Sequence, residues 1–517
     1  MRPVVVRVMA LLVIAGSLLA AVLFCSTLLF KRSLTSSREI ALENTHPGTT
    51  NWVIPEIKAA ITEIQAYAGA TSVLPGQKLT FYVSTLKEGT PYHVDIYRLG
   101  WYGGSGGRHM TSQPKQIGHA QGYYNSKIHR LVDCSSCHVD PNTGLIEANW
   151  QPSYMLSVPL DWTTGVYLAK FTDIRGFQTY APFDVRGNSH SLYVVVTPDT
   201  TNEAYNVWGG YSLYQAYSNT VIGSSGKGVK VSFDRPYAAY FGSSYLLPIE
   251  ADAIYWLERQ GYDLSYISSV DLHEDPAQLL QHRAYLSLGH DEYWTKEMRD
   301  GVERARDSGV GLAFLGANAA YWQMRFESDS ADIADRTIVC YKVETGHRDL
   351  ARDPLYKKDN SLVTTTWRDP LLGRPENMLI GIMFSNGTHL GRYFPWRLNP
   401  LTRSPLLNGT GLQPGQSYGC GLVGFEWDRV FANGATPTSL QVIGVSRALD
   451  DNNHPDTSNT TYYIAPSGAM VFATGSIYWT AALDSYRFQT TNSCLHRNPV
   501  VLGIQSLMAH VMDALVH

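Results

Sequence analysis

Two apolar runs on either side of one amphipathic segment constrain the fold of this chain more than any other feature. Residues 286–294 (Leu-Ser-Leu-Gly-His-Asp-Glu-Tyr-Trp) and residues 312–322 (Leu-Ala-Phe-Leu-Gly-Ala-Asn-Ala-Ala-Tyr-Trp) each run apolar up to a glycine and then turn polar. Residues 295–308 carry apolar side chains on one stripe, which predicts a helix. A right-handed crossover between two strands makes them parallel and brings both polar ends to one edge of the sheet. This edge is the predicted functional site.

The polar residues at this edge are candidates for chemistry. His290, Asp291 and Glu292 follow the first strand directly, and we predict that they are catalytic because burial and mutual interaction shift the pKa values of grouped ionisable side chains. Alternatively, Asp291 and Glu292 cap the following helix. The amide of Asn318 either orients a substrate or only tolerates a left-handed turn. The predicted substrate-binding residues are Asn318, Trp294 and Trp322.

The composition excludes one class of function. The chain has 517 residues, enough for two or three domains. Charged residues make up 17% and the formal net charge is −4, so the sequence offers no basic surface for nucleic acid. Aromatic residues reach 12%, which is ample material for aromatic-lined pockets.

The first 32 residues predict a signal anchor. Arg7 and Lys31 flank an apolar run of 23 residues, from Val8 to Phe30. A transmembrane helix needs about 20 such residues, whereas the core of a signal peptide has about 7 to 15. We therefore predict a single-pass membrane protein whose body lies outside the cytoplasm, in the periplasm or at the cell surface.

The rest of the chain divides by pattern. Residues 33–51 are polar and predict a linker. In residues 52–187, short apolar or alternating runs are separated by Gly, Pro and Asn, which is typical of an all-β sandwich. From residue 190 to 517, strands alternate with helices and predict a doubly wound parallel α/β sheet, with a β-rich insertion at about 337–446.

Three motifs in this order resemble the N,N-dimethylformamidase beta (large) subunit-like C-terminal domain family. They are Gly-His-Asp-Glu-Tyr-Trp at 289–294, Phe-Leu-Gly-Ala-Asn-Ala-Ala-Tyr-Trp at 314–322 and Gly-Phe-Glu-Trp-Asp-Arg at 424–429. The resemblance implies a glutamine-amidotransferase-like, flavodoxin-type sheet. It also implies hydrolysis of the carbon–nitrogen bond in small linear amides, by water and a mononuclear iron held by two tyrosines and a glutamate.

The ligands that the resemblance implies are Glu426, Tyr321 and a second tyrosine, for which Tyr293 is the candidate and Tyr341 the alternative. Phenolate and carboxylate are hard anionic donors that suit Fe³⁺ acting as a Lewis acid. The competing interpretation is that the tyrosines are packing aromatics at the sheet edge and that acidic side chains near Arg429 form a plain salt bridge.

The cysteines allow several pairings. Cys134, Cys137 and His138 match a haem-attachment pattern, but they lie in a β-rich segment, so we predict a disulfide or other cysteine partners and expect no haem. Apart from Cys25 the chain has five cysteines, and their connectivity cannot be deduced from spacing.

A second function is also compatible with these patterns. Trp101 and Trp208 each precede glycines and offer aromatic surfaces suited to sugar stacking, so the alternative is a non-catalytic cell-envelope protein that binds carbohydrate or another ligand. The expected partners are thus the membrane and a small amide or an envelope carbohydrate, with a homo-oligomer left open.

Overall fold

The computed structural model describes residues 38–187, 190–215, 227–347, 349–388, 391–486, 488, 494 and 500–517. The predicted signal anchor at 1–32 lies outside these residues. Within the described ranges, no helix has both the length and the apolar character that a membrane span requires.

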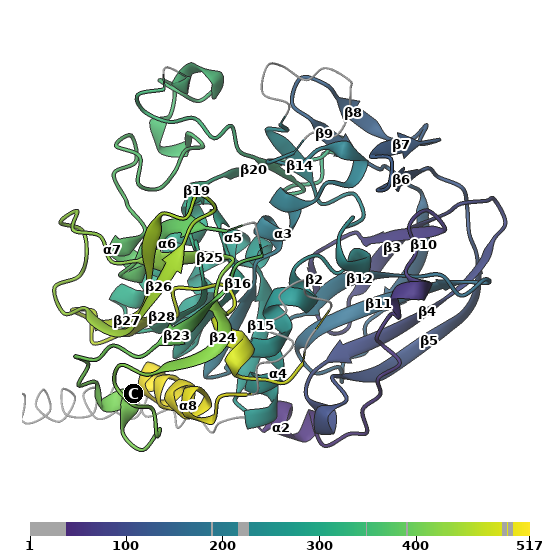
Figure 1. The fold of residues 1–517 in the computed structure, drawn as a ribbon. Helices are drawn as coiled ribbons and strands as arrows, with labels where there is room; N and C mark the ends of the chain where they lie inside the picture. Colours follow the sequence, from purple (N-terminus) through teal and green to yellow (C-terminus); the bar gives the residue numbers. More distant parts are fainter. Residues whose placement is uncertain are drawn as a thin grey trace, which may run out of the picture. The chain divides into compact units, whose positions relative to one another are not determined.

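The N-terminal part of the described chain is built from two sheets (Figure 1). The first has the order β1-β3-β10, with β1 Ile64–Ala68, β3 Lys78–Thr85 and β10 Pro152–Ser157. The second has the order β2-β12-β11-β4-β5, with β2 Ser72–Val73, β12 Gln178–Val185, β11 Gly165–Asp173, β4 Pro91–Leu99 and β5 Gly107–Ile117. Apolar side chains from both sheets share one buried core that includes Phe81, Val94 and Phe171.

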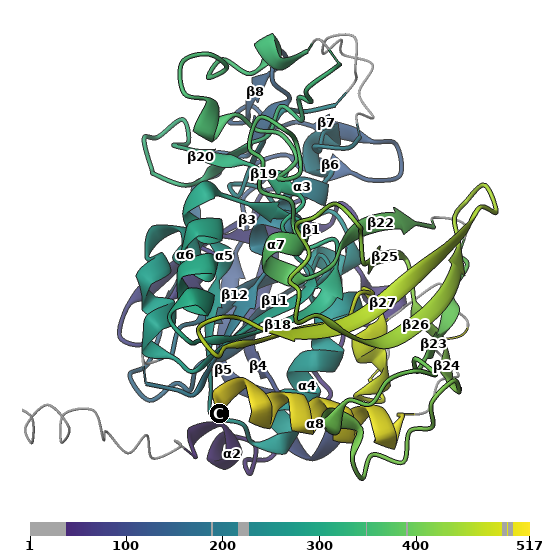
Figure 2. The ribbon, with the colours of Figure 1, turned by 90° about the vertical axis from the view of Figure 1, so that its left-hand side faces the viewer.

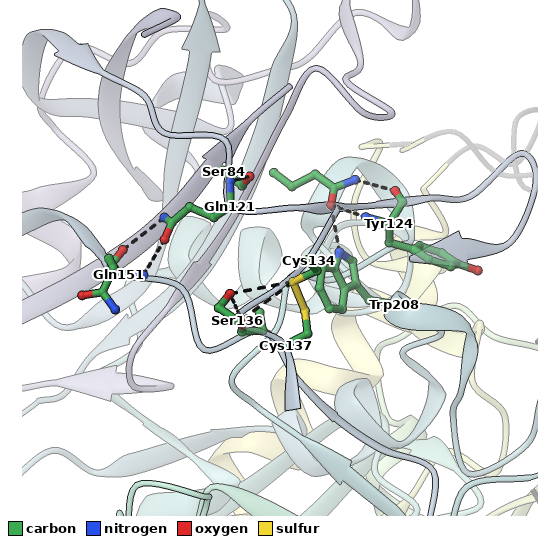
Figure 3. The surroundings of a disulfide bond; sticks show 10 residues. Ser84, Gln121, Tyr124, Cys134, Ser136, Cys137, Gln151 and Trp208 are labelled. Atoms are coloured by element: carbon green, nitrogen blue, oxygen red, sulfur yellow. Dashed lines mark hydrogen bonds between the residues drawn. A yellow bond between two sulfur atoms is a disulfide. The ribbon is translucent and has the colours of Figure 1, made fainter. Parts of the chain in front are cut away.

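Two short hairpins follow in the same part of the chain. They are formed by β6 Tyr123–Asn125 with β7 Arg130–Val132, and by β8 His138–Asp140 with β9 Leu145–Glu147. A disulfide joins Cys134 to Cys137 between them, beside Trp208 (Figure 3). The sequence left open whether Cys134 and Cys137 pair with each other or with other cysteines, and in the structure they pair with each other. A second disulfide joins Cys420 to Cys494.

The largest sheet has seven strands and carries the predicted site. Its order is β15-β13-β16-β18-β28-β27-β26. The bounds are β13 Tyr193–Thr197, β15 Leu264–Ser268, β16 Ala284–His290, β18 Gly311–Ala317, β26 Gln441–Leu449, β27 Pro455–Ile464 and β28 Met470–Ala473. The first five strands in this order are parallel, and β27 and β26 are antiparallel. Strands β13, β15, β16, β18 and β28 are buried along their whole length, which explains their continuous apolar runs.

Helices pack against both faces of this sheet (Figure 2). Helices α4 Ala251–Gln260 and α8 Leu502–Val516 share a core with one face, and α5 Ser269–Glu274 and α6 Lys296–Asp307 share a core with the other. The predicted helix between the two key strands is α6. It begins at the N-cap Thr295, whose side chain accepts a hydrogen bond from the Met298 backbone, so the prediction that Asp291 and Glu292 cap this helix is wrong.

The segments between β18 and β26 form small two- and three-stranded sheets. The remaining α-helices and strands of the described residues are α2 Glu39–Glu43, α3 Asp199–Tyr205, α7 Asn377–Ile380, β14 Lys230–Ser232, β17 Tyr293–Trp294, β19 Trp322–Gln323, β20 Arg325–Glu327, β21 Thr337–Val339, β22 Met383–Gly387, β23 Phe394–Arg397, β24 Ser417–Val423 and β25 Glu426–Arg429. Strand β25 touches the end of the large sheet, because the Asp428 backbone donates to the Gly475 carbonyl at 3.1 Å.

The predicted fold class is wrong. It was a flavodoxin-like, doubly wound parallel α/β sheet preceded by a β-sandwich and a transmembrane helix. The described chain is instead mostly β-sheet with many small sheets, and its largest sheet is mixed. The physical reason is the hairpin of β26 and β27, which extends the sheet beyond β28 with antiparallel strands. The predicted transmembrane helix lies outside the described residues.

Candidate active site

A cavity of about 690 Å³ lies where β16 and β18 end. Gly289 has a φ of +57°, which lets the chain turn sharply at the end of β16. The backbones of Gly289 and Gly316 also lie very close, since a Cβ on Gly316 would be 1.6 Å from the Gly289 carbonyl oxygen. The two glycines noted in the sequence therefore let the strand ends approach each other. The described residues lining the cavity include nine aromatic side chains and two carboxylates, Glu292 and Glu426.

A buried histidine sits between these two carboxylates. The Nε2 atom of His290 lies 3.1 Å from Oε2 of Glu426 and 3.3 Å from Oε2 of Glu292. Neither ring nitrogen makes a well-aligned hydrogen bond among the described residues, so these are charge contacts. Burial alone would lower the pKa of His290, but the two glutamates outweigh burial and raise that pKa to about 10. At neutral pH, His290 is therefore an imidazolium ion.

Two tyrosines donate to Glu292. The Tyr205 hydroxyl donates to Oε2 at 2.8 Å and the Tyr214 hydroxyl donates to Oε1 at 2.5 Å, while the two rings stack with centroids 4.3 Å apart. Tyr205 is the last residue of α3, and Thr201 on the same helix accepts from the Glu292 backbone at 2.8 Å. Burial raises the pKa of both phenols well above its usual value, so both stay protonated. Burial opposes the charge of Glu292, yet contacts with His290 and Tyr214 lower its pKa overall.

The ammonium group of Lys342 lies against the ring of Tyr214. Its Nζ atom is 3.2 Å from the ring centroid of Tyr214, 5.3 Å from that of Tyr293 and 5.2 Å from that of Trp322. The Nζ atom is buried and has no hydrogen-bond partner in the described part of the chain. Burial lowers the pKa of Lys342 to about 8. Sequence patterns had not singled out Lys342, Tyr205 or Tyr214.

Asn318 directly follows β18 and contacts Glu426. Its backbone has a φ of +55°, in the left-handed region, and its Nδ2 atom donates to Oε2 of Glu426 at 2.9 Å. Its backbone N–H donates to Oδ1 of Asp428 at 2.8 Å, and burial raises the pKa of Asp428 to about 7. Asn318 thus occupies the left-handed turn, and its amide holds a carboxylate at the cavity, while its orientation of a substrate stays a prediction.

Asp291 points away from the cavity. Its carboxylate accepts from Ser287 Oγ and from Trp294 Nε1, each at 2.8 Å, and burial raises its pKa to about 6. The structure thus separates Asp291 from His290 and Glu292, and it buries Trp294 with Asp291. Trp322 does line the cavity.

The predicted metal ligands are not brought together by any hydrogen bond or ion pair among the described residues. Tyr321 lines the cavity, with the Arg368 guanidinium 4.9 Å from its ring centroid, and burial raises its pKa to about 12. Tyr293 lies outside the lining, and its hydroxyl has no hydrogen-bond partner in the described chain. The alternative, Tyr341, packs against Arg325 instead.

The contacts of Glu426 bear on whether the site belongs to an enzyme or to a binding protein, because a glutamate paired with an arginine is less available for chemistry. Glu426 contacts His290 and Asn318, and no ion pair links it to an arginine among the described residues. Arg429 forms its salt bridge with Asp456, at 3.4 Å, and not with Glu426. Trp208, proposed as a sugar-stacking surface, is buried.

The comparisons with known proteins agree with the motifs. Residues 93–494 match the model of the family described as N,N-dimethylformamidase beta subunit-like, C-terminal. The match covers well over half of the sequence, so the chain belongs to this family.

Individual relatives are more distant. The N,N-dimethylformamidase beta subunits of Paracoccus aminophilus and of an Alcaligenes species are each 24% identical over 287 residues, which is 50% of this chain and 37% of each relative. A cycloisomaltooligosaccharide glucanotransferase from a Paenibacillus species aligns over 58% of this chain and 35% of its own, with 9% identity and a TM-score of 0.15, which does not establish a shared fold.

Proposed function

We propose that this protein hydrolyses the carbon–nitrogen bond of linear amides in the cavity at the ends of β16 and β18. The observation that carries the proposal is the buried contact of His290 with Glu292 and Glu426, because ionisable groups with strongly shifted pKa values at a cavity are typical of acid–base catalysis. Membership of the family and the names of the distant relatives support the same chemistry.

Glu426 is the proposed general base. Its carboxylate lines the cavity, and the Asn318 amide and the His290 imidazolium hold it in place. In the proposed reaction, Glu426 takes a proton from water while the water oxygen bonds to the carbonyl carbon. The carbon–nitrogen bond then breaks, and the nitrogen receives the proton from Glu426, which gives a carboxylic acid and an amine.

The side chains that best fit the iron implied by the family are not the predicted ligands Tyr293, Tyr321 and Glu426. Tyr205, Tyr214 and Glu292 place two phenol oxygens and a carboxylate together at the cavity wall, whereas Tyr293, Tyr321 and Glu426 make no such group. The described residues contain no group of three or more His, Cys, Asp or Glu side chains arranged to hold a metal ion. We propose Tyr205, Tyr214 and Glu292 as the ligands. When bound, ferric iron supplies a Lewis acid that polarises the amide carbonyl.

Iron content and a visible spectrum test this assignment. We expect near-stoichiometric iron and a phenolate-to-iron absorption band in the wild-type protein. Tyr214→Phe should weaken and shift the band, because Tyr205 remains, and the double variant Tyr205→Phe/Tyr214→Phe should lose it. Tyr321→Phe is the matched control that should keep the band unchanged. A band lost in Tyr321→Phe and kept in Tyr214→Phe would refute the ligand assignment.

Amine release from dimethylformamide tests the reaction itself. Glu426→Gln keeps the shape of the side chain but removes the base, so we expect turnover to fall by about 10²- to 10⁴-fold. Wild-type turnover in Glu426→Gln would contradict the proposed role.

The proposed location is outside the cytoplasm. The two disulfides, Cys134–Cys137 and Cys420–Cys494, support it because disulfides persist mainly in oxidising compartments.

A further inference from the structure

The cavity is much larger than a small linear amide requires. An apolar cavity of about 150 Å³ accommodates benzene, which is itself larger than dimethylformamide. The cavity here has about 690 Å³, within the range of pockets that hold drug-sized ligands. A small amide at Glu426 would leave most of this volume unfilled.

The walls of the remaining volume are aromatic. Tyr240 and Tyr245 line one part, with ring centroids 6.1 Å apart. Tyr321 and Phe384 line another, with centroids 5.4 Å apart in an edge-on arrangement, and Phe425 lies 5.7 Å from the His290 ring. Aromatic side chains at these separations favour further edge-on or offset contacts with an inserted ring.

The Tyr240 to Tyr245 wall is held in a strained conformation. Tyr240, Phe241 and Ser244 have φ values of +52°, +62° and +50°, which are costly for residues with a Cβ. Two contacts hold it: Asn202 Oδ1 accepts from Ser244 Oγ and from the Tyr245 backbone, each at 3.1 Å. Asn202 lies on α3, the helix that also supplies Tyr205. Helix α3 therefore contacts both this wall, through Asn202, and Glu292, through Tyr205.

The charge of the lining restricts the ligand further. The described residues that line the cavity include Glu292 and Glu426 but no lysine or arginine. Away from the proposed iron, an anionic substituent would meet no cationic side chain of the described lining, because Lys342 and Arg368 lie behind the rings of Tyr214 and Tyr321. An uncharged ring would instead meet tyrosine and phenylalanine faces.

We propose that the substrate is an uncharged amide that carries an aromatic ring, with the amide at Glu426 and the ring against Tyr240 and Tyr245. This inference rests on the proposed amide hydrolysis for the reaction, but the ring-binding half of the cavity is independent of it.

Binding and turnover are measured separately to keep the two ideas apart. N-Benzylformamide and dimethylformamide are titrated into the purified protein by calorimetry, and release of each amine is then followed. Because the ring buries apolar surface, we expect N-benzylformamide to bind at least about tenfold more tightly and to show the higher kcat/KM. In Tyr240→Ala the affinity ratio should fall severalfold. The matched control, Tyr356→Ala, changes a tyrosine that does not line the cavity, and it should leave the ratio unchanged.

The outcomes distinguish the two proposals. Tight, Tyr240-dependent binding of N-benzylformamide without amine release would support the aromatic ligand class and overturn the proposed hydrolysis. Turnover of both amides with equal affinity would overturn the aromatic preference and leave the hydrolysis standing. An affinity ratio that falls equally in Tyr240→Ala and Tyr356→Ala would also overturn the assignment of the ring site.

Discussion

Replacing Asn318 by glycine separates the role of its amide from the role of its backbone. Glycine accepts the φ of +55° without strain, but it removes the hydrogen bond from Nδ2 to Glu426, which is 2.9 Å long and buried. A hydrogen bond to a charged group contributes about 1.5 to 3 kcal/mol, so Asn318→Gly should lower the free energy of unfolding by about that amount. Asn318→Ala should cost about 1 to 2 kcal/mol more, because alanine disfavours the left-handed region.

The same loss should appear in catalysis if the amide holds Glu426 in its working position. A penalty of about 1.5 to 3 kcal/mol in the transition state corresponds to a fall in turnover of about 10- to 150-fold. Urea unfolding gives the stability, and amine release from dimethylformamide gives the turnover.

The matched control for this prediction is Asn453, an asparagine with a φ of +65° whose hydrogen bond from Arg392 is exposed to solvent and therefore contributes little. Asn453→Gly should change the free energy of unfolding by less than about 0.5 kcal/mol. If Asn318→Gly is as stable and as active as the wild type, the amide contributes nothing, and Asn318 serves only the turn.

Three further predictions concern stability. Arg98 and Glu258 form a buried ion pair 2.8 Å long, so Glu258→Gln should lower the free energy of unfolding in urea by about 3 to 5 kcal/mol, and a loss below about 1 kcal/mol would contradict the pairing. Burial raises the pKa of Glu250 to about 8. The folded protein therefore keeps a proton that the unfolded chain loses near pH 4, so stability should fall as the pH rises from about 4 to about 8. Glu250→Gln should flatten that slope in urea titrations at several pH values, and an unchanged slope would refute the assignment. Removing the Cys420–Cys494 disulfide, which spans 74 residues, should lower the free energy of thermal unfolding by about 4 to 5 kcal/mol relative to the oxidised wild type. The reduced wild type is the control and should show at least the same loss.

Part of the site could be predicted from sequence because strand geometry is regular. Polar residues that end two parallel strands meet at one sheet edge, and this rule brings His290 and Asn318 to the same cavity. The structure places His290 and Glu292 together at the cavity and Asp291 against Ser287 and Trp294. Asp291 and Glu292 lie beyond the end of β16, so strand alternation could not separate them in the sequence.

The tyrosine partners of Glu292 could not be found in the same way. Tyr205 ends a short helix and Tyr214 lies in an irregular segment, so no strand or helix period links them to Glu292. The chain has 32 tyrosines, and residue type alone does not single out two of them. The ligands predicted from the motifs, Tyr293 and Tyr321, follow β16 and β18. The Tyr293 hydroxyl has no hydrogen-bond partner among the described residues, and the Tyr321 ring packs against Arg368.

The architecture was harder to predict than the site because local patterns do not determine strand direction. The buried run at β28 was predicted, but the runs at β26 and β27 are partly exposed and alternate, and hydrophobic periodicity does not reveal which edge they join. Their hairpin turns a predicted parallel sheet into a mixed one. The glutamate that completes the site comes from β25, a strand outside the large sheet, which only the motif at 424–429 indicated.

Charge balance links the proposed reaction to the proposed ligand. Glu292 and Glu426 share one imidazolium, His290, and the phenols of Tyr205 and Tyr214 add hydrogen bonds but no charge. Away from the proposed iron, a further carboxylate brought by a ligand would be buried near Glu426 with no lysine or arginine on the described lining, and burying an unpaired charge is costly. An uncharged amide avoids this cost and still offers a carbonyl carbon to water activated by Glu426. The same balance favours a cation at Glu292, which is the charge that ferric iron would supply.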